Sequence, residues 1–452
     1  MKLTQEQILA QIKQSPNKKV KVAITDIDGV LRGKYIHHDK FASIVEGGFG
    51  FCDVIFGWDS SDQSYENAEF TGWHTGFPDA QARVDVSTYR NVPWDNEVPF
   101  FLADFVGKDG GSHHLCPRSL LKRIKKEAEG MGYGASFGQE FEFFNFRETS
   151  EGINARGFHE PEHLTPGMFG YSILRMSQNK EFLNEVYDSL YKFRVPLEGL
   201  HTETGPGVLE AAILYDDVLE SADRAVLFKS SVKEIGQKYG IMPTFMAKIT
   251  DKLPGCSGHL HQSLWKDAKN VFYDDKRPHG MSELMEHYMA GLLHCLPHVL
   301  SFYAPTINSC KRLVEGAWAP TTVTWGIDNR TVAIRVLSGS PKSTRMELRV
   351  VGSDANPYLA HAASLASGLY GIKHKLKLPV TATVGNGYRD ERNGRLPGSL
   401  WDACQVTKNS DVAKELFGEA FVKHFAFSRE WECKQFAKAV TNWEFQRYFE
   451  VI

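Results

Sequence analysis

Residues 135–146, ASFGQEFEFFNF, have the alternating pattern of a β-strand and carry two carboxylates. Glu140 and Glu142 are two positions apart, so in a strand both side chains point to one face. The intervening Phe141 and Phe143 occupy the other face. Two carboxylates held this closely repel each other, and a divalent cation would remove the repulsion. The stretch is compatible with a metal-binding face, although a solvated acidic face is the plainer interpretation.

A second pair of carboxylates, Glu203 and Glu210, lies in HTETGPGVLE at residues 201–210. The Gly-Pro-Gly segment between them must turn the backbone sharply, which can bring both side chains to one point. Two exposed loop glutamates are the alternative, because loops are commonly polar.

Two histidines follow in GCSGHLHQSL at residues 255–264. His259 and His261 share one face of a predicted strand, and the small residues before them permit close approach of a ligand or another backbone. One histidine could bind a metal ion while the other contacts a phosphate. A hydrogen-bonded structural pair is the alternative interpretation.

The run TRMELRV at residues 344–350 alternates without exception and predicts a strand with Arg345, Glu347 and Arg349 on one face. A salt-bridged surface strand would have the same pattern. Guanidinium groups also bind carboxylates and phosphates, and three more of them lie upstream, on Arg312, Arg330 and Arg335. Carboxylates for metal ions together with arginines for oxyanions indicate phosphoryl transfer.

The hydrophobic pattern around these motifs indicates an α+β fold, because strands and helices interleave without a regular βα repeat. Residues 19–38 predict a β-hairpin that turns at Asp28-Gly29. KDGGSHH at residues 108–114 is the clearest polar break, so we expect a small domain at 1–113 and a larger one at 114–452. Helices are predicted at residues 5–14, 117–130, 216–239, 281–300, 356–373 and 430–448.

Composition excludes several classes of protein. The 452 residues are 42% hydrophobic and 24% charged, which is typical of a folded globular chain with more than one module. The net charge of −3 provides no basic field for nucleic acid, and neither a secretory signal nor an apolar run of 18 residues occurs, so no nucleic-acid or membrane partner is expected. Seven scattered cysteines without a CxxC spacing favour a reducing cytoplasm. A nucleotide would need a binding device other than a Walker loop or GxGxxG, because both motifs are missing.

Taken in order, these motifs resemble the glutamine synthetase superfamily. The resemblance rests on GQEFEFF, HTETGPGVLE, GHLHQSL, NSCKRLVEGAWAP, WGIDNRTVAIRV and RMELRVVGSDANPYLAHAASLASGLYGI, with DGVLRGK near the N-terminus and the closing WEFQRYFEVI. It implies a small N-terminal β-grasp domain followed by a large catalytic domain. The catalytic domain would be built on an antiparallel curved sheet with flanking helices.

The resemblance also implies roles for individual residues. One catalytic metal ion, Mg²⁺ or Mn²⁺, would be held by Glu142, Glu203 and Glu210, and a second by Glu140, His259 and Glu347. ATP would lie near His261, Ser263 and Arg335, and the acid substrate and its surroundings would involve Arg312, Gly255 and Trp318. The residues matching those that take part in catalysis are Asp59, Arg330 and Arg349.

Members of this family transfer the γ-phosphoryl group of ATP to the side-chain carboxylate of glutamate, and an amine then attacks the activated acyl carbon. They form double-ringed homo-oligomers, commonly dodecamers, whose active sites lie between neighbouring subunits. Asp59 in GWDSSD matches the family aspartate that helps to bind the incoming ammonium from the neighbouring subunit.

Three positions depart from the ammonia-using members of the family. EGAWAP places Trp318 where those members have a glutamate that closes over the site and accepts the ammonium proton. Pro254 replaces a usual asparagine and Val208 a common glutamine, which leaves open whether the acid is glutamate or a close analogue. We therefore expect a γ-glutamylpolyamine or other γ-glutamylamide synthetase. Glutamine synthetase itself is the alternative, and a non-catalytic structural relative is disfavoured because all six predicted metal ligands are present.

Overall fold

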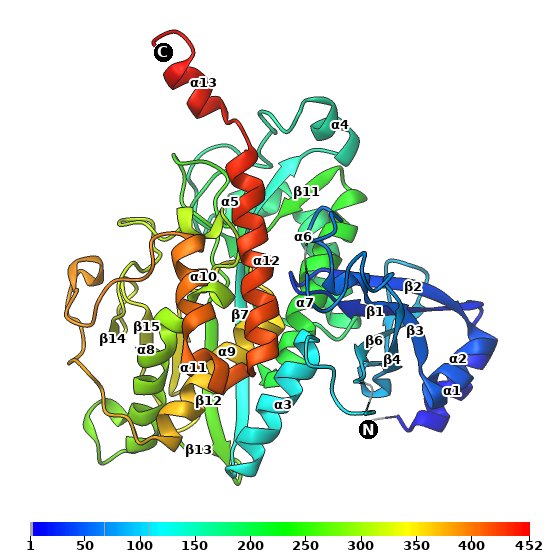
Figure 1. Cartoon of the computed structure of the whole chain (residues 1–452), viewed down its shortest axis with the longest axis horizontal. Coiled ribbons are helices and arrows are strands. Elements are labelled where there is room, and N and C mark those ends of the chain that lie inside the picture. The colour runs from blue at the N-terminus through cyan, green and yellow to red at the C-terminus, as the bar shows by residue number, and fades with distance from the viewer. Residues whose placement is uncertain (1–2, 67, 108) are drawn as a thin grey trace.

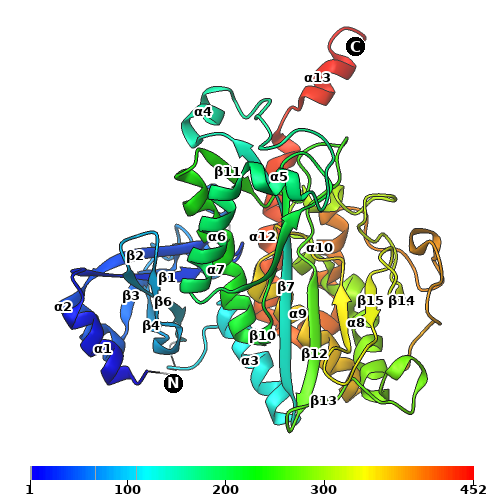
Figure 2. The same cartoon turned by 180° about the vertical axis from the view of Figure 1, so that it is seen from behind.

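The computed structural model describes residues 3–66, 68–107 and 109–452 (Figure 1). Within these residues the strands form a six-stranded sheet between residues 19 and 105 and a ten-stranded sheet between residues 134 and 348. Helices pack against both sheets, and the smaller sheet lies to one side of the larger one (Figures 1 and 2). The predicted α+β class is therefore confirmed.

The smaller sheet has the strand order β2-β1-β6-β4-β3, with β5 paired to β6. Its first two strands form the predicted hairpin, and Gly29 takes the positive φ of +83° that the turn requires. Helices α1 (Gln5–Gln14) and α2 (His38–Gly47) bury Ile8, Ile12, Phe41 and Ile44 against the sheet. The strands are β1 (Lys19–Thr25), β2 (Leu31–His37), β3 (Phe49–Cys52), β4 (Asp79–Val84), β5 (Arg90–Val92) and β6 (Val98–Phe105).

The larger sheet has the order β14-β15-β16-β12-β7-β9-β8, and its pairs are antiparallel except for β14 with β15. Strand β7 (Gly134–Arg147) lies in the middle and contains the predicted acidic stretch. Phe141 and Phe143 are fully buried against Phe228 and Phe245, so Glu140 and Glu142 face the other side. The other strands are β8 (Leu197–Thr202), β9 (Val208–Ile213), β10 (Asp216–Asp217), β11 (Ile241–Thr244), β12 (Leu260–Lys266), β13 (Lys269–Asn270), β14 (Trp325–Ile327), β15 (Ile334–Leu337) and β16 (Arg345–Leu348).

Helices cover the phenylalanine-bearing face of the larger sheet. In Figure 2, β7 and β12 run side by side with α9 and α12 behind them. The predicted helices at 117–130, 216–239, 281–300 and 356–373 correspond to α3 (Pro117–Gly130), α7 (Val218–Gln237), α8 (Glu283–Tyr303) and α9 (Pro357–Lys373). The remaining helices are α4 (Ser150–Ala155), α5 (Ile173–Gln178), α6 (Lys180–Lys192), α10 (Leu400–Asn409) and α11 (Asp411–Phe417). Among the described residues, no helix has both the length and the apolar character needed to span a membrane.

The predicted single helix at 430–448 is wrong, because the chain forms two helices there. Helix α12 (Glu419–Lys438) ends before Ala439, whose backbone is extended, and α13 (Asn442–Tyr448) begins after it. Thr441 caps α13 in a capping box with Glu444, and this arrangement satisfies backbone N–H groups that a continuous helix would pair differently. Helix α13 projects away from the rest of the chain in both views (Figures 1 and 2).

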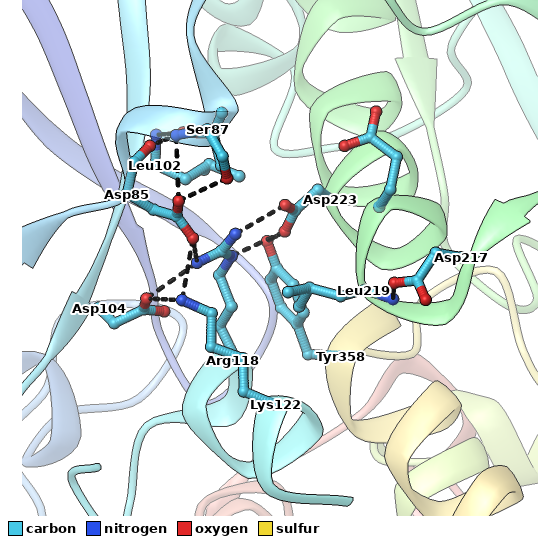
Figure 3. A network of polar contacts seen from close by, with 12 residues as sticks. Asp85, Ser87, Leu102, Asp104, Arg118, Lys122, Asp217, Leu219, Asp223 and Tyr358 are labelled. Atoms are coloured by element: carbon cyan, nitrogen blue, oxygen red, sulfur yellow. Dashed lines mark hydrogen bonds and ion pairs between the residues drawn. The ribbon is translucent and has the colours of Figure 1, made fainter. Parts of the chain in front are cut away.

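A buried ion cluster joins the smaller sheet to the helices (Figure 3). Arg118 on α3 is 2% exposed and forms two parallel hydrogen bonds of 2.8 Å with Asp223 on α7. It also donates to Asp85 and Asp104 from the smaller sheet and its edge, at 2.9 and 2.8 Å. The predicted boundary between residues 113 and 114 lies close to this junction and stays a prediction. Lys108, the first residue of the predicted break, lies outside the described residues.

Candidate active site

One row of predicted ligands crosses strands β7, β9 and β8 of the larger sheet. Glu142 on β7 lies directly opposite Glu210 on β9, and Glu210 lies opposite His201 on β8. Directly opposed residues of antiparallel strands project from the same face, and like charges in such a pair are destabilising. The strand register therefore forces two carboxylates together, which a cation between them would relieve.

The Gly-Pro-Gly turn brings Glu203 to the same row. The turn connects β8 to β9, with Gly207 at a φ of +70° and the amide of Glu203 donating to the carbonyl of Val208 at 3.0 Å. His201 lies 3.3 Å from Glu210 and 3.8 Å from Glu203. The turn thus brings the two glutamates into one cluster with His201, and their role as metal ligands stays a prediction.

A second row crosses β12, β16 and β15. His261 lies opposite Glu347, and Glu347 lies opposite Arg335, which donates to it at 3.0 Å. Arg349 also donates to Glu347. Glu140 on the adjacent β7 approaches the Nε2 atom of His261 to 3.1 Å and the Nδ1 atom of His259 to 3.5 Å. The second predicted set of ligands is therefore also assembled at one place.

The donor atoms fit hard divalent cations. The ligand atoms of Glu140, His261 and Glu347 all lie within 4.8 Å of one another, and so do those of a second group, His201, Glu203 and Glu210. Oε2 of Glu203 and Nε2 of His259 are buried without a hydrogen-bond partner among the described residues. Buried atoms of this kind are costly unless something binds them, and oxygen-rich groups suit Mg²⁺ or Mn²⁺.

The grouping differs in detail from the predicted one. His261 is closer to Glu140 than His259 is, and His201 was assigned no role by the sequence argument. A signal for His201 exists in the sequence, because it stands two positions before Glu203. Tyr171 stacks on the His201 ring at 4.5 Å from the chain segment before α5, and no local pattern predicts such a long-range contact.

The electrostatics of the two rows are opposite. Burial opposes ionisation of Glu140, but the charges and hydrogen bonds of His261 and His259 hold its pKa well below the ordinary value. Burial also opposes ionisation of Glu347. The charges of His259, Arg349 and His261 outweigh this effect and lower the pKa of Glu347 to about 2. Burial raises the pKa of Glu142, and the charge of Glu210 adds to that rise. The charge of Glu142 is therefore less compensated by its neighbours than the charges of Glu140 and Glu347 are.

Two cavities meet at these rows, because Glu140 and Glu210 line both of them. The first cavity, of about 400 Å³, is also lined by the predicted ATP residues His261 and Ser263. Arg345 on its wall donates to Nδ1 of His261 at 3.1 Å. The structure thus brings these two residues together in one cavity, and their role in binding ATP stays a prediction.

The second cavity, of about 370 Å³, is lined by two of the three residues predicted for the acid side, Gly255 and Trp318. Gly255 lines it, and a Cβ there would come within 2.5 Å of the carbonyl oxygen of Ala247, so the close approach of backbone requires a glycine. Trp318 also lines it, with a left-handed φ of +58° and 54% of its surface exposed. The wall also contains Arg330 and Arg349, together with five predicted metal ligands, Glu140, Glu142, Glu203, Glu210 and His259.

Four predicted residues line neither cavity, namely Glu347, which lies in the second row, and Arg312, Arg335 and Asp59. Arg312 is 1% exposed and donates to the carbonyls of residues 349–351, so in this structure its guanidinium binds backbone. Arg335 is occupied by Asp328 and Glu347. Asp59 lies after β3 of the smaller sheet and accepts a hydrogen bond from the indole of Trp431. The roles assigned to these residues stay predictions.

Comparison with known proteins gives consistent matches. The model of the glutamine synthetase catalytic domain matches residues 114–448. Type-1 glutamine synthetase 2 of Dictyostelium discoideum is 52% identical over 450 residues, covering 98% of this chain and 86% of that protein. The glutamate–isopropylamine ligase of Pseudomonas sp is 37% identical over 437 residues, covering 96% and 95%.

A solved complex of GmaS with ADP has a TM-score of 0.84 to this structure, with 26% identity and coverage of 98% of this chain and 99% of that one. This likeness confirms the predicted architecture of a curved sheet with flanking helices. The family model covers most of the chain, and both named relatives align along nearly its whole length. The chain therefore belongs to the glutamine synthetase family of ATP-dependent glutamate ligases.

Proposed function

We propose that this chain is a γ-glutamylamide synthetase, which joins the side-chain carboxylate of glutamate or a close analogue to an amine that carries carbon, with ATP as the phosphoryl donor. The observation that carries the proposal is Trp318 in the wall of the second cavity. The name of the related glutamate–isopropylamine ligase is in keeping with such an amine.

The segment around Trp318 offers an apolar surface in place of a charged gate. Val208, Pro254 and Ala317 line the same cavity. The nearest carboxylate on the segment, Glu315, is paired with Arg389 at 3.1 Å and does not line the cavity. An indole face attracts an alkylammonium ion by about 0.5–2 kcal/mol, whereas the strongly hydrated ammonium ion loses a charge partner and a proton acceptor there.

The phosphoryl-transfer side of the proposal rests on the carboxylate rows. Glu142, Glu203 and Glu210, with His201 beside them, would hold one Mg²⁺ or Mn²⁺ ion, and Glu140, His259 or His261, and Glu347 the other. Such ions, when bound, neutralise the charge on the phosphate oxygens of ATP. Arg330 and Arg349, in the wall of the acid cavity, are the chain's own cations for the transferred group. We assign Ser263 and Arg345 to orienting the nucleotide in the first cavity.

The place of Asp59 supports an assembly with shared sites. Asp59 lines neither cavity that meets the carboxylate rows, so within one chain it does not face the acid substrate. We propose that it receives the charged nitrogen of the amine in the site of a neighbouring subunit, in a homo-oligomer of the double-ringed, dodecameric kind. Mixed oligomers of Asp59→Ala and Glu347→Ala subunits should then regain part of the activity through sites made of intact halves.

The test of the amine is a comparison of kcat/KM for ammonium, methylamine, ethylamine and a diamine, using phosphate release with glutamate and ATP. Wild type should prefer at least one organic amine, and Trp318→Glu should shift the ratio toward ammonium. Trp401→Glu serves as the matched control, because Trp401 is 44% exposed and lies outside the cavity. A ratio that is unchanged in Trp318→Glu would refute the role of the indole.

Glutamine synthetase is the second candidate, and the 52% identity to a type-1 glutamine synthetase favours it. In that case Trp318 packs the segment and the ammonium proton leaves by another route. Wild type that prefers ammonium over every organic amine would establish this alternative and overturn the amide proposal.

A further inference from the structure

We propose that Trp431 on α12 is a positioning residue for Asp59, which it orients to receive the charged nitrogen of the amine. This inference rests on the role of Asp59 in the proposed function. Trp431 is 7% exposed, and its indole Nε1–H donates to Oδ2 of Asp59 at 2.9 Å. The two residues are 372 positions apart in the chain, so this contact joins the loop after β3 to helix α12.

The loop that carries Asp59 uses only one of its carboxylate oxygens. Oδ1 accepts from the backbone amides of Ser61 and Gln63 at 2.9 and 3.0 Å, which closes the turn. Oδ2 accepts the indole hydrogen bond and has a further acceptor direction left. The turn therefore fixes Oδ1 of Asp59, and the hydrogen bond from Trp431 fixes the orientation of Oδ2.

An indole is suited to this task because its N–H donates a single hydrogen bond and carries no charge. A lysine or arginine at this place would orient the carboxylate equally well, but it would neutralise the charge that attracts an ammonium group. Among the described residues, no cation forms an ion pair with Asp59. The carboxylate is thus oriented and keeps its charge.

The indole is itself fixed by its surroundings. Tyr65 meets the Trp431 ring edge to face at 5.8 Å and contacts Phe427 in the same way. Two residues before Trp431, Arg429 binds Asp28 in the turn of the β1–β2 hairpin at 2.5 Å and the carbonyl oxygen of Pro305 at 2.8 Å. These contacts hold α12 against the β1–β2 turn and the segment at Pro305, so the indole meets Asp59 from a fixed position.

Loss of the indole N–H should act on amine binding alone. In Trp431→Phe, Oδ2 of Asp59 loses its fixed direction, and we expect the KM for the amine to rise about tenfold. The KM values for ATP and glutamate and the kcat at saturating amine should change less than twofold. Phe427→Leu is the matched control, because it also removes an aromatic contact to Tyr65 but no hydrogen bond to Asp59.

A double-mutant cycle with Asp59→Asn makes the test specific. If Trp431 acts through Asp59, Trp431→Phe should add nothing to the amine KM of Asp59→Asn. Replacing Trp431 by 3-benzothienylalanine, which has the indole shape but no N–H, should reproduce the effect if Trp431→Phe fails to fold or assemble. The inference is overturned if either change raises all three KM values together, or if its effect adds to that of Asp59→Asn.

The two proposals can fail separately. An unchanged amine KM in Asp59→Asn would remove Asp59 from the proposed function, and the role of Trp431 with it. A raised amine KM in Asp59→Asn with an unchanged one in both Trp431 variants would overturn only the role of Trp431.

Discussion

Two clusters of buried charge differ in how far the chain itself supplies their counter-ions. At the junction of the two sheets, Arg118 and Lys122 lie among Asp85, Asp104 and Asp223. Each of these three carboxylates forms an ion pair with an arginine or lysine of the chain. On the face of the larger sheet, five glutamates lie together, and the two adjacent arginines pair with only one of them, Glu347. The first cluster thus has an arginine or lysine partner for each of its carboxylates, whereas the second has arginine partners for one of its five.

The difference separates a structural cluster from a functional one. A buried carboxylate without a counter-ion destabilises the folded chain, so such a group is retained where a ligand supplies the missing charge. An added cation should not stabilise the folded chain at the junction. A cation that binds to the glutamate rows should raise the free energy of unfolding. Substitutions in the two clusters should therefore have effects of opposite sign on stability.

The largest effect should follow from Arg118→Met. Within the described part of the chain, this change leaves Asp223 without an ion pair and Asp85 and Asp104 with Lys122 alone, and breaking a buried pair in this way costs about 3–5 kcal/mol. Urea unfolding should show this loss, together with loss of activity. Lys122→Met, at a side chain that is 29% exposed, should cost distinctly less. Equal losses of stability in the two variants would mean that the pair of hydrogen bonds between Arg118 and Asp223 contributes nothing further to the free energy of unfolding.

Glu142→Gln should abolish turnover without weakening the metal-free fold. Removing one ligand and charge from the metal site should lower kcat by about three orders of magnitude, which corresponds to about 4 kcal/mol. Because burial and Glu210 raise the pKa of Glu142, its charge destabilises the metal-free chain, and the neutral amide removes that charge. Urea unfolding in EDTA should show equal or higher stability than wild type. A loss of stability comparable to that of Arg118→Met would contradict the contrast between the clusters.

Added Mn²⁺ should stabilise the chain only through the glutamate rows. At a free concentration one hundred times its Kd, one bound ion adds about 2.7 kcal/mol to the free energy of unfolding. Lys122→Met should keep this gain in full, and Glu142→Gln should lose most of it. A gain that survives in Glu142→Gln would place the ion elsewhere.

Much of the fold follows from patterns that are local in the sequence. The alternation in β7 and the helical periodicity of α3, α7, α8 and α9 were sufficient to predict those elements. The break between α12 and α13 was missed, because the capping box of Thr441 and Glu444 competes with a helical pattern on both sides of it. The Thr-x-x-Glu pattern of a capping box is visible in the sequence at residues 441–444, but the helical periodicity on both sides of it favoured one continuous helix.

The sequence was sufficient to predict which site residues share a face of a single strand, but not which residues pair across strands. Pairs two positions apart, such as Glu140 and Glu142, share a face in any strand. The pairing of Glu142 with Glu210 depends on the register between β7 and β9, and a local pattern contains no information on register. The same limit applies to Arg312, because its sequence neighbours do not reveal that its guanidinium binds backbone carbonyls rather than a cavity. Recognition of the family supplied the grouping that the patterns could not.

The smallest effect concerns how the junction responds to acid. Burial raises the pKa of Asp85, but the charges of Arg118 and Lys122 outweigh it and hold that pKa well below its ordinary value. A carboxyl with a depressed folded-state pKa stabilises the chain above its unfolded pKa of about 4, and this contribution is lost as the pH falls toward the folded-state value. Asp85→Asn should therefore reduce the slope of stability against pH below pH 4, by at most about 1.4 kcal/mol per pH unit. Unfolding by urea between pH 5 and 3 measures the slope, and Asp109→Asn is the control, at an exposed carboxylate that accepts from the amide of Gly111. An unchanged slope in Asp85→Asn would show that Asp104 and Asp223 are sufficient partners for the buried arginine. The ion pairs of Asp85 would then contribute nothing to the pH dependence of stability.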